Sequence, residues 1–225
     1  SKIEVVISAN NQNFDKETTT KTGLEALDVL NGIGLQSEEI AWITGSDVNF
    51  CAQAFPTVGY DHPDAPILTV LGAVLRNGFL HSAIREKGGA YGSGAQQDSA
   101  SRSFRFFSYR DPNCMETFNA FNESIEWSLK SINSEKLEEG ILGVISSIDK
   151  PGSPAGEARA DFNQNIRGID QSKRKIFRSR VINCSVERLV EVSNKYLTCE
   201  PKRSVISGKH FEKEIKDLGL SIHNV

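Results

Sequence analysis

The chain is poor in the residues that build sulfur-based sites. Among its 225 residues it has one methionine and four cysteines, and no two cysteines form a Cys-x-x-Cys pair. This spacing disfavours a structural zinc site made from thiolates. We therefore expect the thiols to be reduced and mostly buried, which is typical of a soluble protein in a reducing compartment, either the cytoplasm or an organelle matrix. The four residues are Cys51, Cys114, Cys184 and Cys199.

No charge of one sign dominates the sequence. Its 26 basic and 29 acidic residues leave a formal net charge of -3, which gives no electrostatic reason to expect a nucleic-acid partner. No apolar run approaches the roughly 18 residues that span a bilayer, so no membrane partner is expected either. With 38% hydrophobic and 24% charged residues, the composition is that of an ordinary globular protein.

The first residues lack the features of a targeting segment. Ser1 to Ile7 includes the acidic Glu4 within a short strand-like run, which is unlike a signal peptide. We expect the chain to begin partway through a longer protein. Neither an internal repeat nor a long linker divides the sequence, and 225 residues suffice for a sizeable core. Residues 1–225 are therefore predicted to form one domain.

The motifs of metal and nucleophile chemistry are also missing. The four histidines are His62, His81, His210 and His223, and none stands four residues from another. The sequence has no His-Glu-x-x-His motif, no reversed His-x-x-Glu-His form and no Gly-x-Ser-x-Gly elbow. His81 and Glu86 are five residues apart on a predicted helix, which places them on different faces. We expect no metal site and no hydrolase nucleophile in this chain.

Helix and strand periodicities fill most of the sequence instead. Apolar residues recur at three- and four-residue steps after Asp64, which predicts a largely buried helix. Asp64 is expected to cap the start of this helix and Gly88 to cap its end. Ser103–Tyr109 alternates between aromatic and polar residues, with two phenylalanines on one face. It is predicted to pair antiparallel with Gly92–Asp98.

The remaining elements follow from the same patterns. Further strands are predicted at residues 2–9, 41–43, 48–52 and 202–207, and further helices at 24–30, 118–129, 134–148, 158–166, 173–182 and 186–197. Asn113 and Glu116 resemble a capping box for the helix that follows them. The basic run Lys173–Arg180 is interpreted as the solvated face of a helix whose Ile176 and Phe177 point inward. Because strands and helices mix without regular βαβ alternation, we predict an α+β fold with helices packed on one face of a mainly antiparallel sheet.

The most informative stretch is the turn between the long helix and the strand that follows it. Arg85 and Tyr91 stand side by side at the helix exit, where guanidinium and phenol can both hydrogen-bond a ligand's backbone carbonyl or carboxylate. The glycines of this turn are Gly88, Gly89, Gly92 and Gly94. They match no phosphate loop, and the C-terminus of a helix disfavours phosphate. The residues alone leave two interpretations open, a ligand-binding pair or a helix-end Arg beside a packed Tyr.

A family resemblance favours the ligand-binding pair. The stretch Phe79–Ala95, with Arg-x-x-Gly-Gly-Ala-Tyr-Gly at its centre, resembles the signature of presequence-protease-type members of the pitrilysin/insulinase zinc metallopeptidase family. Three further stretches fit the same group, namely Val-Asn-Phe-Cys-Ala-Gln-Ala at 48–54, Phe-Phe-Ser-Tyr-Arg-Asp-Pro at 106–112 and Asp-Lys-Pro-Gly-Ser-Pro at 149–154. The resemblance runs in order from Ala41 to Leu197, whereas the first 40 residues match only loosely.

The resemblance implies both a fold and a function. Enzymes of this family resemble a clamshell, in which four α+β domains form two halves around a closed chamber that degrades unstructured peptides. The chain would be the C-terminal, non-zinc domain of such a zinc metalloendopeptidase. Zinc would be bound by the missing N-terminal half, so this chain alone is not expected to be active. Its expected partners are the peptide substrates and that N-terminal half of the same polypeptide.

The resemblance also implies roles for residues of the turn. Carried over, Arg85 and Tyr91 hydrogen-bond the substrate backbone near the scissile bond, and Tyr91 helps to stabilise the tetrahedral intermediate. The four glycines of the turn would let the chain bend tightly and approach the substrate. The competing hypothesis is a non-catalytic structural core subunit built on the same fold. A zinc motif in the upstream sequence of the same protein would separate the two.

Overall fold

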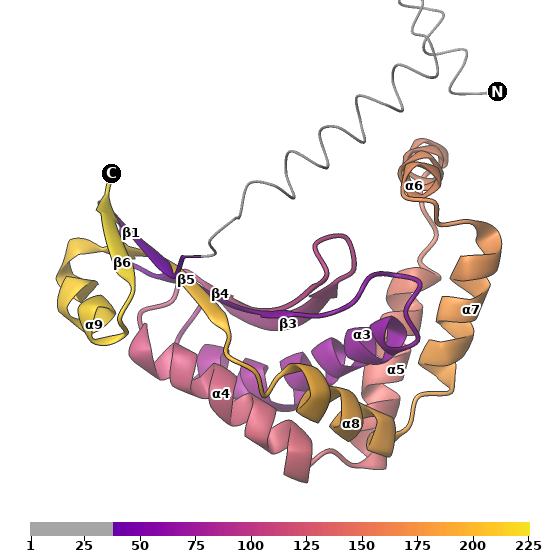
Figure 1. Ribbon diagram of the computed structural model, residues 1–225, viewed down its shortest axis with the longest axis horizontal. Coiled ribbons are helices and arrows are strands. Elements are labelled where there is room, and N and C mark those ends of the chain that lie inside the picture. Colours follow the sequence, from indigo (N-terminus) through magenta and orange to yellow (C-terminus); the bar gives the residue numbers. More distant parts are fainter. Residues whose placement is uncertain (1–37) are drawn as a thin grey trace, which may run out of the picture. The chain divides into compact units, whose positions relative to one another are not determined.

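The computed structural model describes residues 38–225, and the strand and helix predicted at 2–9 and 24–30 lie outside the described residues. Within residues 38–225, six strands form one open sheet in the order β3-β4-β2-β5-β1-β6 (Figure 1). The strands are β1 (Ile40–Thr44), β2 (Phe50–Pro56), β3 (Gly92–Asp98), β4 (Ser103–Tyr109), β5 (Lys202–Gly208) and β6 (Ser221–Asn224). Strand β3, which directly follows Tyr91, therefore lies at one edge of the sheet.

The sheet is mixed, with antiparallel pairs in the majority. β2 pairs antiparallel with β4 and with β5, and β3 pairs antiparallel with β4. β1 pairs parallel with both β5 and β6. The predicted α+β fold with a mainly antiparallel sheet is thus confirmed. The parallel pairs arise at the end of the sheet that contains β6, a strand that the sequence patterns did not predict.

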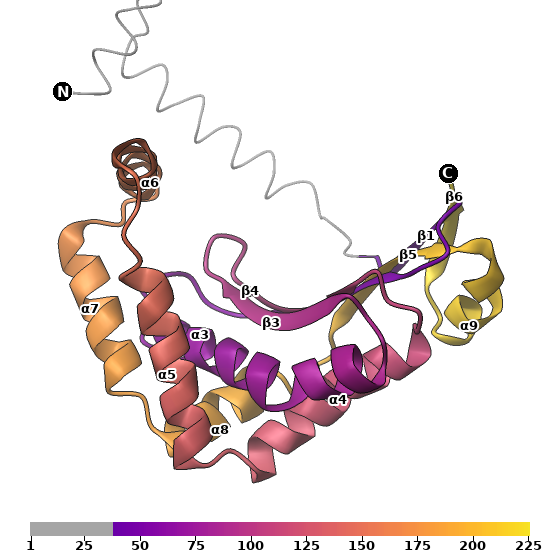
Figure 2. The same ribbon diagram turned by 180° about the vertical axis from the view of Figure 1, so that it is seen from behind.

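Helices cover one face of the sheet, as predicted (Figures 1 and 2). The helices of the described residues are α3 (Asp64–Leu75), η1 (Arg76–Lys87), α4 (Met115–Lys130), α5 (Ser134–Ile148), α6 (Pro154–Ile166), α7 (Gln171–Ile182), α8 (Val186–Tyr196), η2 (Lys209–Phe211) and α9 (Glu212–Asp217), of which α6 lies away from the sheet. α3 and η1 pack against β3 and α4 packs against β2, whereas α5, α7 and α8 pack on the outside of α3. The core lies between the sheet and these helices, and it contains the strand side chains that point toward the helices.

Aromatic side chains fill the space between the sheet and its helices. Phe104 and Phe106 are fully buried, and their alternation with exposed residues along β4 confirms the predicted face of this strand. The Phe106 ring lies 5.5 Å from that of Phe121 on α4 and 6.0 Å from that of Phe55 on β2. Such aromatic pairs each add roughly 0.5–1.5 kcal/mol beyond the burial of their area. They bind α4 and the middle strands into one core.

The long helix changes its hydrogen-bond pattern halfway along its length. It begins as the α-helix α3 and continues as η1, a π-helix of 12 residues. A π-helix closes i→i+5 rather than i→i+4 hydrogen bonds, so residues five apart share a face. His81 Nδ1 accordingly lies 3.5 Å from Glu86 Oε1. The prediction that these two residues point to different faces was wrong, because it assumed α-helical geometry.

This helix is also the most apolar one in the described part of the chain. Asp64–Lys87 spans 24 residues, and by length and a mean hydropathy of 1.4 it is long and apolar enough to cross a membrane. Half of the most apolar 18-residue stretch of this helix is buried inside the fold, where α3 lies between β3 and the outer helices. Core packing therefore accounts for its composition. The expectation of no membrane partner stays a prediction.

Two predicted helix caps are replaced by other contacts. Pro63 precedes α3 in the cap position, and the Asp64 side chain makes no capping hydrogen bond. Cys114 rather than Asn113 precedes α4, and no side chain caps that helix. The Met115 N–H at its start instead donates to Glu214 Oε1 at 2.5 Å. Both capping predictions were wrong because residues distant in sequence provide the competing partners.

Candidate functional site

The turn after η1 reverses the chain within a few residues. Gly88 is the C-cap of η1, which confirms its predicted position, and Gly89 follows with a φ of +81°. The Gly89 N–H donates to the Arg85 carbonyl at 3.1 Å, and the Ala90 N–H donates to the Ile84 carbonyl at 3.1 Å. Only glycine adopts the left-handed conformation at Gly89 without a steric cost. The turn is therefore fixed by backbone hydrogen bonds rather than by side chains.

Arg85 and Tyr91 project from the two ends of this turn. Both side chains are exposed, Tyr91 by 64% of its area, whereas Ile84 and Ala90 beside them are buried. Buried neighbours anchor the backbone of each residue and leave its polar end free. Among the described residues, Arg85 Nη1 has His81 Nε2 as a neighbour at 3.4 Å, and no hydrogen bond links Arg85 to Tyr91. The structure thus places the predicted pair at one turn, with both side chains exposed and one Arg85 nitrogen beside His81.

The Tyr91 ring is held by two residues at the end of β4. Its centroid lies 5.7 Å from that of Tyr109, with the rings tilted by 57°. The guanidinium carbon of Arg110 lies 5.6 Å from the same centroid, within the range of a cation–π interaction. The Tyr91 N–H also donates to the Arg110 carbonyl at 3.2 Å. Arg110 therefore binds both the backbone and the ring of Tyr91, a role that the sequence patterns did not suggest.

Arg110 has an unusual backbone that its neighbours enforce. Its φ is +49°, in the left-handed region that non-glycine residues rarely occupy. The next residue, Asp111, is fully buried and exchanges two backbone hydrogen bonds with Asn49, of 2.7 and 2.9 Å. The Asp111 carboxylate accepts from Thr117 Oγ1 at 2.7 Å and from the Asn113 N–H at 3.0 Å. This anchoring fixes the chain so that the Arg110 side chain lies over Tyr91.

Two of the predicted glycines make room for aromatic rings. A Cβ atom on Gly92 would lie 2.4 Å from the Tyr109 ring, and one on Gly94 would lie 2.8 Å from the Phe107 ring. Tyr109 opposes Gly92 and Phe107 opposes Gly94 in the β3–β4 ladder, so each ring lies across its glycine. Gly92 and Gly94 therefore have a packing role beside Tyr91. Asn113 completes the support, because its side-chain amide donates to the Gly88 carbonyl at 2.6 Å.

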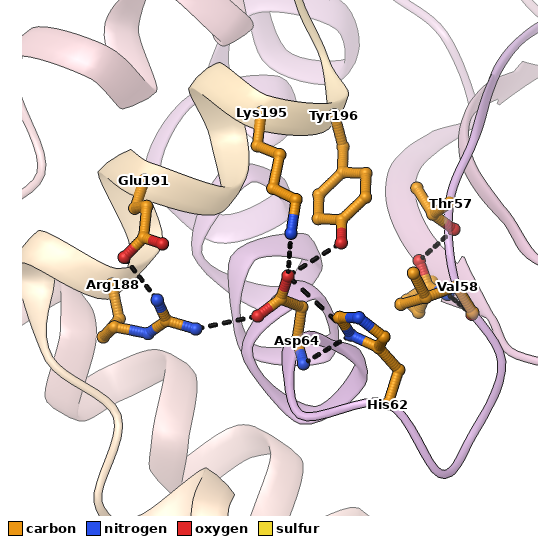
Figure 3. A network of polar contacts seen from close by, with 9 residues as sticks. Thr57, Val58, His62, Asp64, Arg188, Glu191, Lys195 and Tyr196 are labelled. Atoms are coloured by element: carbon orange, nitrogen blue, oxygen red, sulfur yellow. Dashed lines mark hydrogen bonds and ion pairs between the residues drawn. The ribbon is translucent and has the colours of Figure 1, made fainter.

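A second polar cluster lies at the other end of the long helix. The buried Asp64 carboxylate accepts from Arg188 Nη2 at 2.7 Å, Lys195 Nζ at 2.8 Å and the Tyr196 hydroxyl at 2.7 Å (Figure 3). Burial raises the pKa of Asp64, but the hydrogen bonds from Lys195 and Tyr196 outweigh this effect and hold it below its ordinary value. The hydrogen bond to Asp64 in turn raises the pKa of Lys195. The cluster ties the start of α3 to α8, on the order of 30 Å along the helix from Arg85.

A cleft in the described part of the chain is also remote from Arg85 and Tyr91. It has a volume of about 1110 Å³ and lies between the loop after β2, the β3–β4 turn and the end of α6. Its lining includes the polar residues His62, Gln97, Arg102 and Arg167. None of the predicted site residues lines it. The candidate site at the turn is an exposed surface rather than a pocket.

No metal-binding arrangement forms within residues 38–225. No group of three or more His, Cys, Asp or Glu side chains converges there in a way that could hold a metal ion. The residues of the turn therefore do not fit a resident zinc ion, and the contacting pair His81 and Glu86 would provide only two ligands. The cysteines are free, and Cys51, Cys114 and Cys184 are buried, as predicted.

Solved structures with the same fold include a bacterial protease and pitrilysin. The chain superimposes on a protease from Helicobacter pylori with a TM-score of 0.65 and 17% identity, over 75% of this chain and 43% of that one. It superimposes on pitrilysin with a TM-score of 0.56 and 15% identity, over 76% of this chain and 19% of that one. At these identities the similarity shows the fold alone. The architecture is thus that of a pitrilysin-type peptidase domain.

Sequence comparison gives the family. Residues 44–206 match the family described as the PreP C-terminal domain, and the chain belongs to this family. It is 35% identical over 152 residues to the mitochondrial presequence protease of Danio rerio. That match covers 67% of this chain but 14% of the fish protein, so the chain spans a small part of the relatives it matches. The protein is therefore a member of a protease family.

Proposed function

We propose that this chain is the substrate-holding C-terminal domain of a zinc metalloendopeptidase that degrades unstructured peptides inside a closed chamber. The observation that carries the proposal is the pair of exposed donors, Arg85 and Tyr91, on one rigid turn of a PreP C-terminal domain. The zinc ion that such an enzyme uses to activate water would be held by the N-terminal half of the same polypeptide, outside the described residues.

The chemistry of the two side chains suits this role. The Arg85 guanidinium offers several N–H donors in a fixed plane, and the Tyr91 hydroxyl offers one more. Directed at the backbone carbonyls of an extended peptide, they would hold it in register and stabilise negative charge that develops on a carbonyl oxygen. The Tyr109 ring and the Arg110 guanidinium limit rotation of the Tyr91 ring. A fixed donor loses less entropy when substrate binds.

The relatives suggest the class of peptide and the compartment. The matched proteins of fish and fly are named mitochondrial presequence proteases. Transit peptides of mitochondria are amphipathic, rich in arginine and serine, and poor in acidic residues. We propose such peptides as substrates and an organelle matrix as the compartment. Free, mostly buried cysteines are consistent with a reducing matrix.

The proposal is tested in the complete enzyme, zinc-loaded, on a short unstructured peptide. We expect Arg85→Ala and Tyr91→Phe each to lower turnover by at least ~10-fold, equivalent to about 1.4 kcal/mol of transition-state stabilisation. Arg76→Ala is the matched control, because Arg76 is an exposed arginine at the start of the same π-helix. Turnover by Arg76→Ala should equal that of the wild type.

Wild-type kinetics in both site variants would contradict the assigned roles. A second comparison concerns the whole chain, which should be inactive alone and active when combined with the upstream part of its parent protein. An inactive assembly with verified zinc content would instead favour the structural core subunit.

A further inference from the structure

The open face of the sheet has a line of large apolar side chains. Trp42, Phe50, Ile206 and Tyr109 come from four different strands, and each is 39–44% exposed. Their neighbours along the strands, among them Ile43, Cys51 and Val205, are buried beneath the helices. Because side chains alternate between the faces of a sheet, the four exposed residues point to the face that the described helices leave uncovered (Figures 1 and 2). We refer to these four residues as the open-face row.

Strand register brings the open-face row into one line. Trp42 pairs with Ile206, and Ile206 also pairs with Phe50. Ala52 pairs with Phe107, so Tyr109, two residues beyond Phe107, continues the line beside Phe50. The line crosses β1, β5, β2 and β4 at a right angle to the strands. At its far end the Trp42 ring lies 4.9 Å from the ring of His223 on β6.

The apolar character decreases away from this line. The next row on the same face contains the partly exposed Ile40 and Phe107 together with Ser204, Ala52 and Gly94, and the row after it contains Lys202 and Arg105. Rows two residues apart along a strand are separated by about 7 Å. The open-face row, together with Ile40 and Phe107, thus forms an apolar strip that borders a polar surface. Contiguous exposed apolar side chains of this kind usually mark a binding surface.

The strip begins at the candidate site. Tyr109 belongs to the open-face row and lies 5.7 Å from Tyr91, centroid to centroid. Adjacent strands are about 4.8 Å apart, so Trp42, four strand spacings from β3, lies roughly 19 Å from the edge strand that follows Tyr91. An extended peptide covers that distance in about six residues. The strip is thus long enough to contact side chains well away from a bond held at Arg85 and Tyr91.

We propose that the open-face row binds apolar, chiefly aromatic, side chains of the peptide substrate about three to six residues from the bond held at Arg85 and Tyr91. The inference rests on the proposed function and names the feature of the substrate that this surface selects. Aromatic rings stack on Trp42 and Phe50, while the polar row with Lys202 and Arg105 stays solvated. An amphipathic peptide, with apolar side chains on one side, matches an apolar strip that borders a polar surface.

The test uses the complete enzyme and three peptides with the same residues at the cleaved bond. One is short, one is long with Phe at both the third and the sixth residue from that bond, and one is the long peptide with Ser in place of both Phe residues. Trp42→Thr and Phe50→Thr remove rings but keep a residue that favours strands. We expect each to raise KM for the long Phe peptide about 3- to 10-fold and to leave kcat and the other two peptides unchanged. Lys202→Thr, on the same face but outside the row, is the control and should change nothing.

Each other outcome overturns the inference. Unchanged KM for the long Phe peptide, or an equal change for all three peptides, excludes selective binding by the row. A lower melting temperature or separation of the two halves would mean that the row contacts another part of the polypeptide. Arg85→Ala distinguishes failure of the proposed function from failure of the binding strip alone. If it fails to slow all three peptides, the proposed function is wrong; if it slows them while the row variants do not discriminate, only the binding strip is wrong.

Discussion

Arg110 is the residue that links backbone strain to the candidate site. Non-glycine residues in the left-handed region cost roughly 1–2 kcal/mol, so an arginine there needs a compensating reason. Its guanidinium over the Tyr91 ring and its carbonyl on the Tyr91 N–H provide one. Arg102, at the other end of β4, has a φ of +52° but is remote from Tyr91. The two arginines form a natural pair for comparison.

Glycine at either position should relieve the same strain. We expect Arg110→Gly and Arg102→Gly each to leave the free energy of unfolding unchanged or to raise it by up to about 1 kcal/mol. Only Arg110→Gly should lower peptide turnover in the complete enzyme, by about two- to fivefold, because only it removes a cation from the Tyr91 ring. Chemical unfolding and steady-state kinetics measure the two quantities.

A double-mutant cycle of Arg110 and Tyr91 shows whether Arg110 acts by positioning the Tyr91 ring or whether Arg110→Gly disturbs the fold more widely. The effect of Arg110→Gly on turnover should disappear in a Tyr91→Ala background, because no ring remains to be held. An equal loss of turnover with and without the ring, or an equal loss in Arg102→Gly, would contradict the role of Arg110.

At the scale of single elements, the β3–β4 pair depends on glycine opposite aromatic residues. Gly92→Ala would place a Cβ atom 2.4 Å from the Tyr109 ring. We expect this variant to lower the free energy of unfolding by about 1–3 kcal/mol, as overpacking does, and Tyr109→Ala in the same chain to restore part of the loss. Gly143→Ala is the control, and we expect it to raise the free energy of unfolding instead of lowering it.

The opposite sign follows from the surroundings of Gly143. This glycine lies exposed within α5, where an added Cβ meets no atom within 4 Å. Alanine there should raise the free energy of unfolding by roughly 0.5–1 kcal/mol. Urea unfolding of the three variants checks both signs, and stabilisation by Gly92→Ala would show that the Tyr109 ring does not lie across β3.

The elements also show which features the sequence could predict. Periodicity located the helix after Asp64 and the strand Ser103–Tyr109, because burial of one face imposes a repeat on the residues. The π-helical turn of η1 was missed because apolar spacing alone does not distinguish i→i+4 from i→i+5 hydrogen bonds. Ile176 was predicted to point inward but is 50% exposed, whereas Phe177 is buried and stacks on Tyr60 at 4.7 Å.

Contacts between distant residues account for the remaining differences. Asp64 was predicted as a cap, yet its partners Arg188 and Lys195 follow more than a hundred residues later, and no local pattern announces them. Arg110 lies inside a stretch that carried the family resemblance, but its left-handed backbone depends on pairing between Asn49 and Asp111. The predicted pair Arg85 and Tyr91 was located by a local motif, and its supports were not. Their role in substrate binding stays a prediction.

At the scale of the whole molecule, the Asp64 cluster couples stability to pH. The pKa of Asp64 lies below its ordinary value in the folded state, so the folded protein favours the carboxylate more than the unfolded chain does. The stabilisation that the Asp64 carboxylate gives to the folded state is therefore fully present above about pH 4, the ordinary pKa of aspartate. It is lost as the pH falls through the lower pKa that Asp64 has in the folded state. We expect Asp64→Asn to lower the free energy of unfolding by about 2 kcal/mol at pH 7.

The difference between wild type and Asp64→Asn should shrink as pH falls below 4, because protonation removes the same charge from the wild type. Urea unfolding at a series of pH values measures it. Lys136→Ala is a suitable control, since Lys136 pairs with Glu139 on an exposed surface and should matter little at any pH. A constant difference across the whole pH range would show that Asp64 acts through packing rather than charge.

The order of the strands also constrains when the molecule can be completed during synthesis. β2, β3 and β4 lie within about sixty residues of one another and can associate early, whereas β5 must insert between β2 and β1. Among the described strands, β1 therefore has no partner until a strand more than 150 residues later leaves the ribosome. Such distant pairing is intrinsically slow and exposes an unpaired strand edge meanwhile. The open-face row cannot exist before that step, so the surface proposed to bind unfolded peptides is among the last parts of the domain to form.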